Sequence, residues 1–299
     1  MNTNNPFTLK EKEGELPCLD FGQSTKEVEV RIGLSALGVN EARQEYARWE
    51  KKSFNQLKKD SHKEWEEQLA SIDVKGRTDD DRVIFYTSLY RACLSPVDVT
   101  SVDGRYLGTD GKIYSADGFR YYSNWSLWDT YRAFHPLLNL VNQPLQADIA
   151  NSMLAHYDKS VEHMLPFWSF YGNETWCMIG YHSCSVLADM IVKGVKGFDY
   201  ERAYEAMKTT AMNPHYDCLP EYRELGYVPF DKEAESVSKT LEYAYDDYCI
   251  AQAAKVLGKT EDYEYFFKRS RSYQNFFDKE LGFMRGRGTK GEFHEPFNP

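Results

Sequence analysis

The sequence predicts a mainly α protein, in which a short β segment and charged linker helices precede a larger helical region. Apolar residues recur with helical spacing from Asp79 almost to the end of the chain. The stretch from 39 to 69 is rich in Glu, Lys, Gln and Arg, which is typical of solvent-exposed connecting helices. Before it, aliphatic residues alternate with polar ones, the period of a strand with one buried face: Val28, Val30, Ile32 and Leu34.

These patterns divide the chain into three parts. We expect residues 1–35 to hold β structure, residues 36–76 to form linker helices, and residues 77–299 to form a helical domain. Within the helical domain the periodicity predicts about seven helices. Their expected ranges are Asp79–Leu94, Ser126–Leu140, Leu145–Val161, Trp176–Val192, Tyr200–Met212, Val237–Leu257 and Glu261–Phe277.

Two helix junctions resemble each other, LADMIVKGVKGFDYERAYEAM and AQAAKVLGKTEDYEYFFKRS. Each contains an apolar helix, a Lys and Gly stop, an acidic residue with a Tyr, and a second amphipathic helix. Glycine ends a helix because it adopts the left-handed conformation without a Cβ clash. The similarity predicts stacked helical hairpins, with longer loops such as 213–235 gathered at one end, where a binding site is expected.

Composition excludes several classes of protein. A net charge of -10 with scattered Lys and Arg provides no basic surface for nucleic acid. No apolar run approaches the roughly 18 residues that span a bilayer. Four cysteines lie in apolar helical patterns without metal-ligand spacing, so we expect buried, inert thiols: Cys93, Cys177, Cys184 and Cys249.

The segment VDGRYLGTDGKIYSADGFRYYS contains Asp-Gly pairs at 103, 110 and 117. Asp-Gly is a strong signal for a tight turn, so short strands joined in a small meander are expected here. A calcium loop is the alternative interpretation. It would need carboxylates at alternate positions, which this segment lacks.

Aromatic residues form 15% of the chain, including 22 Tyr, and are dense in YYSNWSLWDTYRAF at 121–134. Ser126 followed by Asp129 fits a helix N-cap, which is the purely structural interpretation. A helix beginning there also places Trp128, Asp129 and Arg132 within one turn. A stacking ring, an acceptor and a forked donor together suit the vicinal hydroxyls of a sugar, so we predict a sugar-binding group.

A second cluster, FYGNETWCMIGYHSCSVLADM, places Glu174, Trp176 and His182 around an expected helix start. We predict that these residues also bind substrate, although a lone His in an apolar helix is more often a hydrogen-bonded core residue.

A third cluster, SVSKTLEYAYDDYCIAQAAKVLGK, carries Glu242, Asp246 and Asp247 on one helix. A paired-carboxylate site is possible here, and an acidic, solvated helix face is the commoner explanation.

These three clusters, with FMRGR at 283–287, resemble the calcium-dependent α-mannosidases of glycoside hydrolase family 92. The resemblance covers most of residues 25–299 and implies a β-sandwich joined by linker helices to an (α/α)6 toroid. Residues 1–35 would be the end of the sandwich, and 77–299 an incomplete toroid. The resemblance also implies mannose-containing glycans as substrates, and a periplasmic, cell-surface or secreted location for the parent enzyme.

The resemblance places the general acid, the general base and most calcium ligands beyond Pro299. The chain is therefore expected to be an internal fragment that is inactive by itself, and about seven helices are also too few to close a double ring of six hairpins. We assign no catalytic residue and no metal ligand within it, and expect calcium only in the intact enzyme. Two alternatives remain, a non-catalytic carbohydrate-binding module and a toroidal glycosidase of another specificity.

Overall fold

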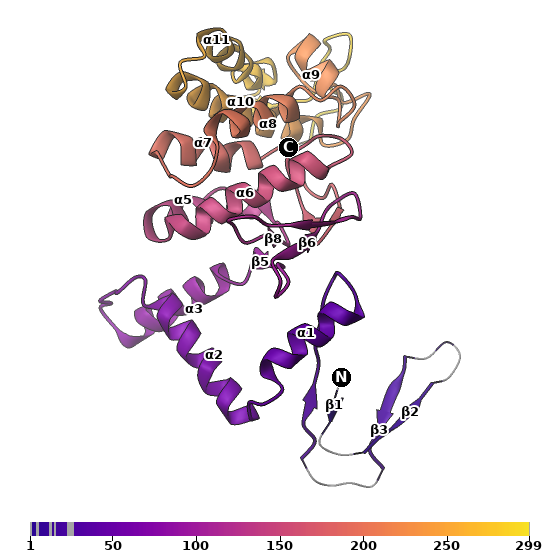
Figure 1. Ribbon diagram of the computed structural model, residues 1–299. Coiled ribbons are helices and arrows are strands. Elements are labelled where there is room, and N and C mark those ends of the chain that lie inside the picture. The colour runs from indigo at the N-terminus through magenta and orange to yellow at the C-terminus, as the bar shows by residue number, and fades with distance from the viewer. Residues whose placement is uncertain (1, 4–5, 12–13, 15, 23–26, 299) are drawn as a thin grey trace. The chain divides into compact units, whose positions relative to one another are not determined.

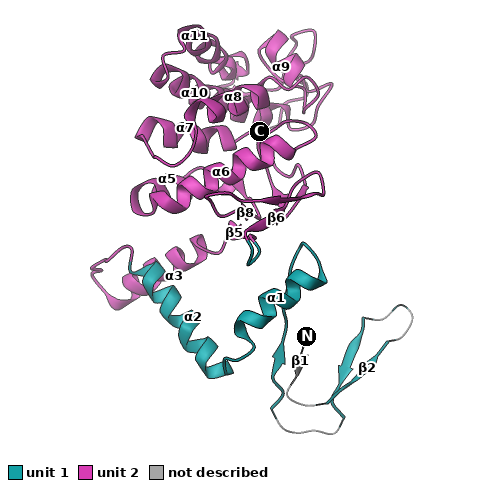
Figure 2. Ribbon diagram, in the orientation of Figure 1, with its two compact units in different colours: residues 1–70, 101–103 teal, residues 71–100, 104–299 magenta. Residues whose placement is uncertain are grey.

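The computed structural model describes residues 2–3, 6–11, 14, 16–22 and 27–298. It divides the chain into two compact units, residues 1–70 with 101–103 and residues 71–100 with 104–299 (Figure 2). The boundary between 70 and 71 falls within the predicted linker. Residues 23–26 of the expected β segment lie outside the described residues, as does Pro299.

The described part of the first unit contains four short strands and two helices. The strands pair as two antiparallel ladders, β1 (Asn2–Thr3) with β4 (Val30–Arg31) and β2 (Thr8–Lys10) with β3 (Cys18–Asp20). Helices α1 (Val39–Trp49) and α2 (Phe54–Leu69) bury no residue fully, as expected for charged connecting helices. Helices therefore occur where the sequence predicts them, and their role as a linker stays a prediction.

The expected buried face of the β segment is wrong. Val30, Ile32 and Leu34 are 43%, 60% and 79% exposed. An aliphatic strand face becomes buried only where a second layer packs on it, and β4 is a two-residue strand without such a layer in the described part of the unit. Val30 and Ile32 instead line an open cavity of about 430 Å³ beside Trp49 and Phe54.

The second unit begins with helix α3 (Asp79–Ala92) and a set of short antiparallel strands. Strand β5 (Val97–Asp98) pairs with β8 (Tyr122–Ser123), and β6 (Arg105–Leu107) pairs with β7 (Ile113–Ser115). Gly111 has φ 75° at the β6–β7 turn, a conformation that its Asp-Gly pair makes easy. The expected tight turn is confirmed, but the expected meander is wrong, because β5 pairs with β8 and β6 with β7 in two separate ladders rather than in sequence order. The alternative, a calcium loop between two helices, does not agree with the short strands that form here.

Helices are the main regular structure of the second unit, which confirms the mainly α prediction. The remaining strands are β9 (Ser169–Phe170), β10 (Asn173–Glu174), β11 (Phe277–Asp278) and β12 (Phe283–Met284), with a 3-10 turn at Ser272–Asn275. The helices are α4 (Leu127–Thr130), α5 (Phe134–Val141), α6 (Gln143–Lys159), α7 (Ser183–Lys193), α8 (Tyr200–Ala211), α9 (Leu219–Leu225), α10 (Ser236–Val256) and α11 (Thr260–Arg269).

The helices stack as hairpins, as the repeated junctions predict (Figure 1). The pairs α5–α6, α7–α8 and α10–α11 pack within themselves, and α7 also packs on α5 and α10. Gly194 ends α7 with φ 72°, and the Asp199 side chain accepts a hydrogen bond from the Arg202 amide to begin α8. Trp128 and Asp129 lie on α4, and Arg132, Glu174 and Trp176 lie in segments between helices.

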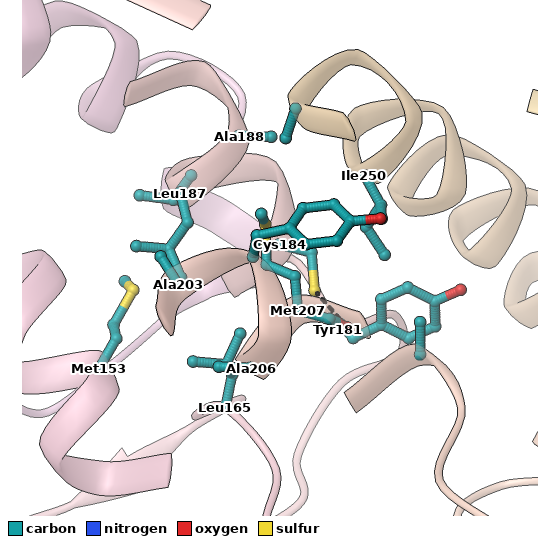
Figure 3. Packing of buried hydrophobic residues seen from close by; sticks show 14 of the residues in the cluster. Met153, Leu165, Tyr181, Cys184, Leu187, Ala188, Ala203, Ala206, Met207 and Ile250 are labelled. Carbon is teal, nitrogen blue, oxygen red and sulfur yellow. Dashed lines mark hydrogen bonds between the residues drawn. The ribbon is translucent and has the colours of Figure 1, made fainter. Parts of the chain in front are cut away.

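The core of this unit is built from one apolar face of each hairpin. Cys184 of α7 lies beside Met207 of α8 (Figure 3), where the Cys184 thiol donates to the Met207 carbonyl at 3.7 Å. Several tyrosines are fully buried at helix interfaces, where they serve packing rather than sugar binding: Tyr181, Tyr204, Tyr222 and Tyr243.

Candidate active site

The first predicted group lies on the single-turn helix α4. Ser126 precedes the helix, but its hydroxyl makes no cap hydrogen bond to a backbone amide. It donates to the Asp129 carboxylate at 2.5 Å instead. Asp129 is exposed, so its carboxylate is open to a ligand as well as to Ser126.

Arg132 lies against the rings of two neighbours. Its guanidinium carbon is 5.0 Å from the Trp128 ring centroid and 4.7 Å from that of Tyr131. The predicted helix Ser126–Leu140 is wrong here, because the backbone breaks between α4 and α5. Pro136 has no amide hydrogen to donate to the Arg132 carbonyl, so it fits only the first turn of a new helix.

His182 joins this group from another loop. Its ring stacks on Tyr131 with centroids 4.0 Å apart and an interplanar angle of 13°. Its Nδ1 lies 2.9 Å from Asp246 Oδ1, which fixes the orientation of the ring. Its Nε2 is buried, lies 3.4 Å from Glu242 Oε2 and has no hydrogen-bond partner among the described residues.

Glu242 of α10 lies near Tyr131, Arg132 and His182. The Tyr131 hydroxyl and Arg132 Nη2 each lie 3.4 Å from one of its carboxylate oxygens. These contacts are long, and the Glu242 side chain keeps 17% exposure, so its oxygens retain acceptor capacity. Sequence reasoning did not place Glu242 in the site, although its position four residues before Asp246 puts both carboxylates on one helix face.

The interpretation of this acidic cluster as a solvated helix face is wrong, because Asp246 and Asp247 are fully buried. Asp246 also accepts the Tyr181 amide at 2.7 Å, and burial raises its pKa. Asp247 lies in the core, where it accepts from Arg269 Nε and Nη2 at 2.8 Å each. The burial of both is possible because each carboxylate has charged or polar donors.

The second predicted group is built around Glu174. It does not lie at a helix start, since α7 begins only at Ser183. Positive φ angles at Trp176 (55°), Met178 (66°) and Gly180 (84°) keep the chain irregular up to the helix. Glu174 ends the β9–β10 hairpin, and its oxygens accept hydrogen bonds from four backbone amides, those of Phe167, Trp168, Thr175 and Trp176.

Trp176 is 38% exposed and lies in an aromatic cluster. Its ring centroid is 5.4 Å from those of both Phe167 and Tyr216. Asp217, the residue after Tyr216, contacts helix α10. Its carbonyl accepts a hydrogen bond from the Tyr243 hydroxyl at 3.1 Å. The group at α4 contacts Glu242, and the segment after Tyr216 contacts Tyr243. Both groups therefore have contacts to the N-terminal half of α10.

Tyr222 and Tyr227, in the long loop 213–235, are both buried. The Tyr222 hydroxyl donates to Asp247 at 2.9 Å and the Tyr227 hydroxyl to the Gly288 carbonyl at 3.1 Å. The contribution of this loop to the second group comes instead from Tyr216.

The described residues contain no group of three or more His, Cys, Asp or Glu side chains that could hold a metal ion. Cys177 is exposed and precedes α7, so the expectation of a buried helical thiol is wrong there. Cys184 is fully buried, and burial raises its pKa, as expected for an inert thiol.

Stacked helical hairpins, with rings, an exposed carboxylate and a guanidinium gathered at α4, agree with the predicted class of helical-toroid glycoside hydrolases. The Glycosyl hydrolase family 92 catalytic domain matches residues 40–299, and the chain belongs to this family. The resemblance stated from the sequence motifs is thereby confirmed.

Two solved structures from Bacteroides thetaiotaomicron are similar to this chain. A family 92 α-mannosidase, in complex with mannoimidazole, is 58% identical with a TM-score of 0.87 over 95% of this chain and 37% of that protein. An inverting mannosidase of the same family is 26% identical, with a TM-score of 0.80 over 99% of this chain and 42% of that one. These structures contain an α/α toroid, which confirms the predicted fold class.

An uncharacterized secreted glycosidase of Arthroderma benhamiae is 25% identical over 287 residues, which are 88% of this chain and 32% of that protein. The chain thus spans about a third of the length of this relative and 37% of the more similar α-mannosidase. Among the described residues, no helix has both the length and the apolar character needed to cross a membrane.

Proposed function

We propose that the chain is part of an exo-acting α-mannosidase that removes terminal α-linked mannose from glycans with inversion of configuration. The observation that carries the proposal is the group at α4. Asp129 offers an exposed carboxylate, and Arg132 lies over the Trp128 ring. The likeness to two mannosidases of the same family supports mannose as the sugar.

In this proposal Trp128, Asp129 and Arg132 bind the terminal sugar. The Trp128 face stacks on the pyranose, while Asp129 accepts from hydroxyl groups and Arg132 donates to them. The Trp128 indole Nε1 is buried without a partner among the described residues, as expected of a donor that a ligand completes. His182 supports the group from beneath, through its stack on Tyr131, and Trp176 contributes a second ring.

Inverting hydrolysis needs one carboxylic acid to protonate the leaving oxygen and one carboxylate to activate water on the opposite face. We propose that both groups, and the ligands of a calcium ion, come from parts of the enzyme outside these 299 residues. The isolated chain should then release no mannose from aryl α-mannosides, with or without calcium. Release by the purified, monodisperse chain would place the chemistry within it and make Asp129 the first carboxylate to test.

The substrate-binding role is tested by Asp129→Asn in the intact enzyme. The amide keeps the shape and an acceptor for Ser126 but loses the charge, so sugar binding should weaken by about 1.5 to 3 kcal/mol. Asp117→Asn is the matched control, because Asp117 is an exposed aspartate in an Asp-Gly turn of the same unit. Hydrolysis of mannosides at the normal rate by Asp129→Asn would remove Asp129 from the site.

Assays with different substrates distinguish the proposed function from two others. A non-catalytic carbohydrate-binding module would bind mannose without hydrolysing any aryl glycoside in the intact protein. A toroidal glycosidase of another specificity would prefer a different member of a panel of aryl α-glycosides. The expected result is hydrolysis of the α-mannoside in preference to the α-glucoside.

A further inference from the structure

The carboxylate of Glu174 is almost entirely occupied by backbone amides. Its Oε1 accepts from Trp168 and Thr175 at 2.9 Å each and from Trp176 at 3.1 Å, and its Oε2 accepts from Phe167 at 3.0 Å. The side chain is 9% exposed. Four amide donors leave little of the carboxylate for a sugar hydroxyl, so direct substrate binding does not explain its placement.

A histidine lies on the inner side of the same carboxylate. His156 Nε2 is 3.6 Å from Glu174 Oε2, and His156 is 1% exposed on α6. Burial lowers the pKa of His156 to about 3, so it is neutral at pH 7. The charge of Glu174 is therefore balanced by the four amides, which makes the backbone geometry at 167–168 and 175–176 depend on this one side chain.

The backbone that these amides fix is strained. Trp176 has φ 55° although it is not glycine, a conformation that persists only where surrounding contacts impose it. The Glu174 bond to the Trp176 amide is one such contact, and ring contacts with Phe167 and Tyr216 are others. Phe167 is itself held by Glu174 through its own amide.

We propose that Glu174 is a positioning residue for Trp176, whose ring it holds in place as a specificity-determining contact for the glycan. This inference rests on the proposed function, since the glycan is the ligand of that site. Glu174 then acts by keeping the Trp176 backbone in its left-handed conformation, and loss of its charge should affect substrate affinity more than the chemical step.

The first test observes Trp176 without using activity. The chain has six tryptophans, so ¹⁹F NMR of protein labelled with 5-fluorotryptophan gives few resonances, and Trp176→Phe identifies that of residue 176. Glu174→Gln should shift or broaden this resonance and that of Trp168, whose amide also donates to Glu174, while the other four tryptophans keep their positions. Glu162→Gln is the matched control, because Glu162 is exposed in the same unit. An unchanged Trp176 resonance in Glu174→Gln would overturn the proposal.

The second test is a double-mutant cycle in the intact enzyme. Glu174→Gln should raise KM for an oligosaccharide by about three- to tenfold, the worth of one aromatic contact, with kcat changed less than about twofold. In a Trp176→Ala background the same change should have little further effect. Additive effects on KM, or a fall in kcat alone, would show that Glu174 does not act through Trp176.

The two tests separate this inference from the proposed function. If the intact enzyme acts on no mannoside, the proposed function fails, and the specificity role of Trp176 fails with it, whatever the ¹⁹F result. If Glu174→Gln does not fold, both measurements are made on Glu174→Asp, which keeps the charge on a shorter side chain. A smaller change in the same direction supports the inference there, and wild-type values overturn it.

Discussion

Glu174 and Glu242 are two carboxylates that each lie beside a buried histidine, yet they are held in different ways. Glu174 accepts four backbone amides within 3.1 Å. The polar neighbours of Glu242 among the described residues are side chains, those of Tyr131, Arg132 and His182, each at 3.4 Å. A carboxylate that backbone amides saturate shapes the chain around it, whereas one with distant side-chain partners keeps acceptor capacity for a ligand.

The largest difference between the two should appear in stability. Glu174→Ala removes the acceptor of four amides, at about 1 to 3 kcal/mol for each amide left buried and unpaired, less what loop relaxation recovers. We expect the free energy of unfolding to fall by about 3 kcal/mol or more. Glu242→Ala should cost less than about 1 kcal/mol, because long contacts at a partly exposed site contribute little.

Urea denaturation of the wild type and both alanine variants measures the comparison directly. Glu162→Ala serves as the reference for removing an exposed carboxylate from the same unit. Equal losses for Glu174→Ala and Glu242→Ala would contradict the distinction between a carboxylate that organises the backbone and one that remains open.

The stability of the protein should depend on pH through His156, the buried histidine beside Glu174. Burial lowers the pKa of His156 to about 3 in the folded chain, against about 6.5 in the unfolded chain. Between pH 3 and pH 6.5 the unfolded chain therefore carries a proton on His156 that the folded chain lacks. Its contribution to stability is therefore present above pH 6.5 and is lost as the pH falls, by about 2 to 3 kcal/mol from pH 6.5 to 4.5.

Burial raises the pKa of Glu174, which acts in the opposite sense, because the folded chain then holds its proton to a higher pH. The measurement is therefore the difference in unfolding free energy between wild type and His156→Gln across this range. That difference should shrink steadily as the pH falls. A difference independent of pH would mean that His156 has the same pKa in the folded and the unfolded chain.

The sequence was sufficient to predict elements that depend on local signals. The hairpin junctions follow from glycine stops such as Gly194, and the β6–β7 turn follows from Asp-Gly at 110. The association of Trp128 with Arg132 was predictable because the two residues lie within one turn of chain. Each of these features is decided by residues that are neighbours in sequence.

Features that depend on distant partners were not predictable in this way. The cluster at 242–247 has the composition of a solvated face, and its burial depends on His182 for Asp246 and on Arg269 for Asp247. The start of α7 at Ser183 depends on positive φ angles at Trp176 and Met178, which no local propensity favours. Tertiary contacts override local pattern at both places.

Asp246 is predicted to orient His182, which lies beside Glu242. Asp246→Asn keeps the volume but removes the charge that accepts from His182 and from the Tyr181 amide. We expect a loss of about 1 to 2 kcal/mol in unfolding free energy, as for weakening charge-assisted hydrogen bonds. The ¹⁵N shifts of the His182 ring should change in the same variant, since the proton on Nδ1 loses its carboxylate acceptor. Unchanged ring shifts would show that Asp246 does not orient His182.

The smallest effect is expected for Glu242→Gln, because the amide keeps one acceptor and the shape of the side chain. In the wild type the Glu242 carboxylate attracts the Arg132 guanidinium, which lies 3.4 Å away. The Arg132 side chain is half exposed, so solvent screens much of this attraction. Removing the charge should leave stability unchanged within about 0.5 kcal/mol and should free the guanidinium to leave the Trp128 ring. Mannoimidazole titrated into the intact enzyme should then bind about two- to fivefold more weakly, as expected for a loss of roughly 0.5 to 1 kcal/mol of preorganisation. Wild-type affinity in Glu242→Gln, with reduced affinity in Asp129→Asn, would confine the site to α4 and make Glu242 a structural neighbour.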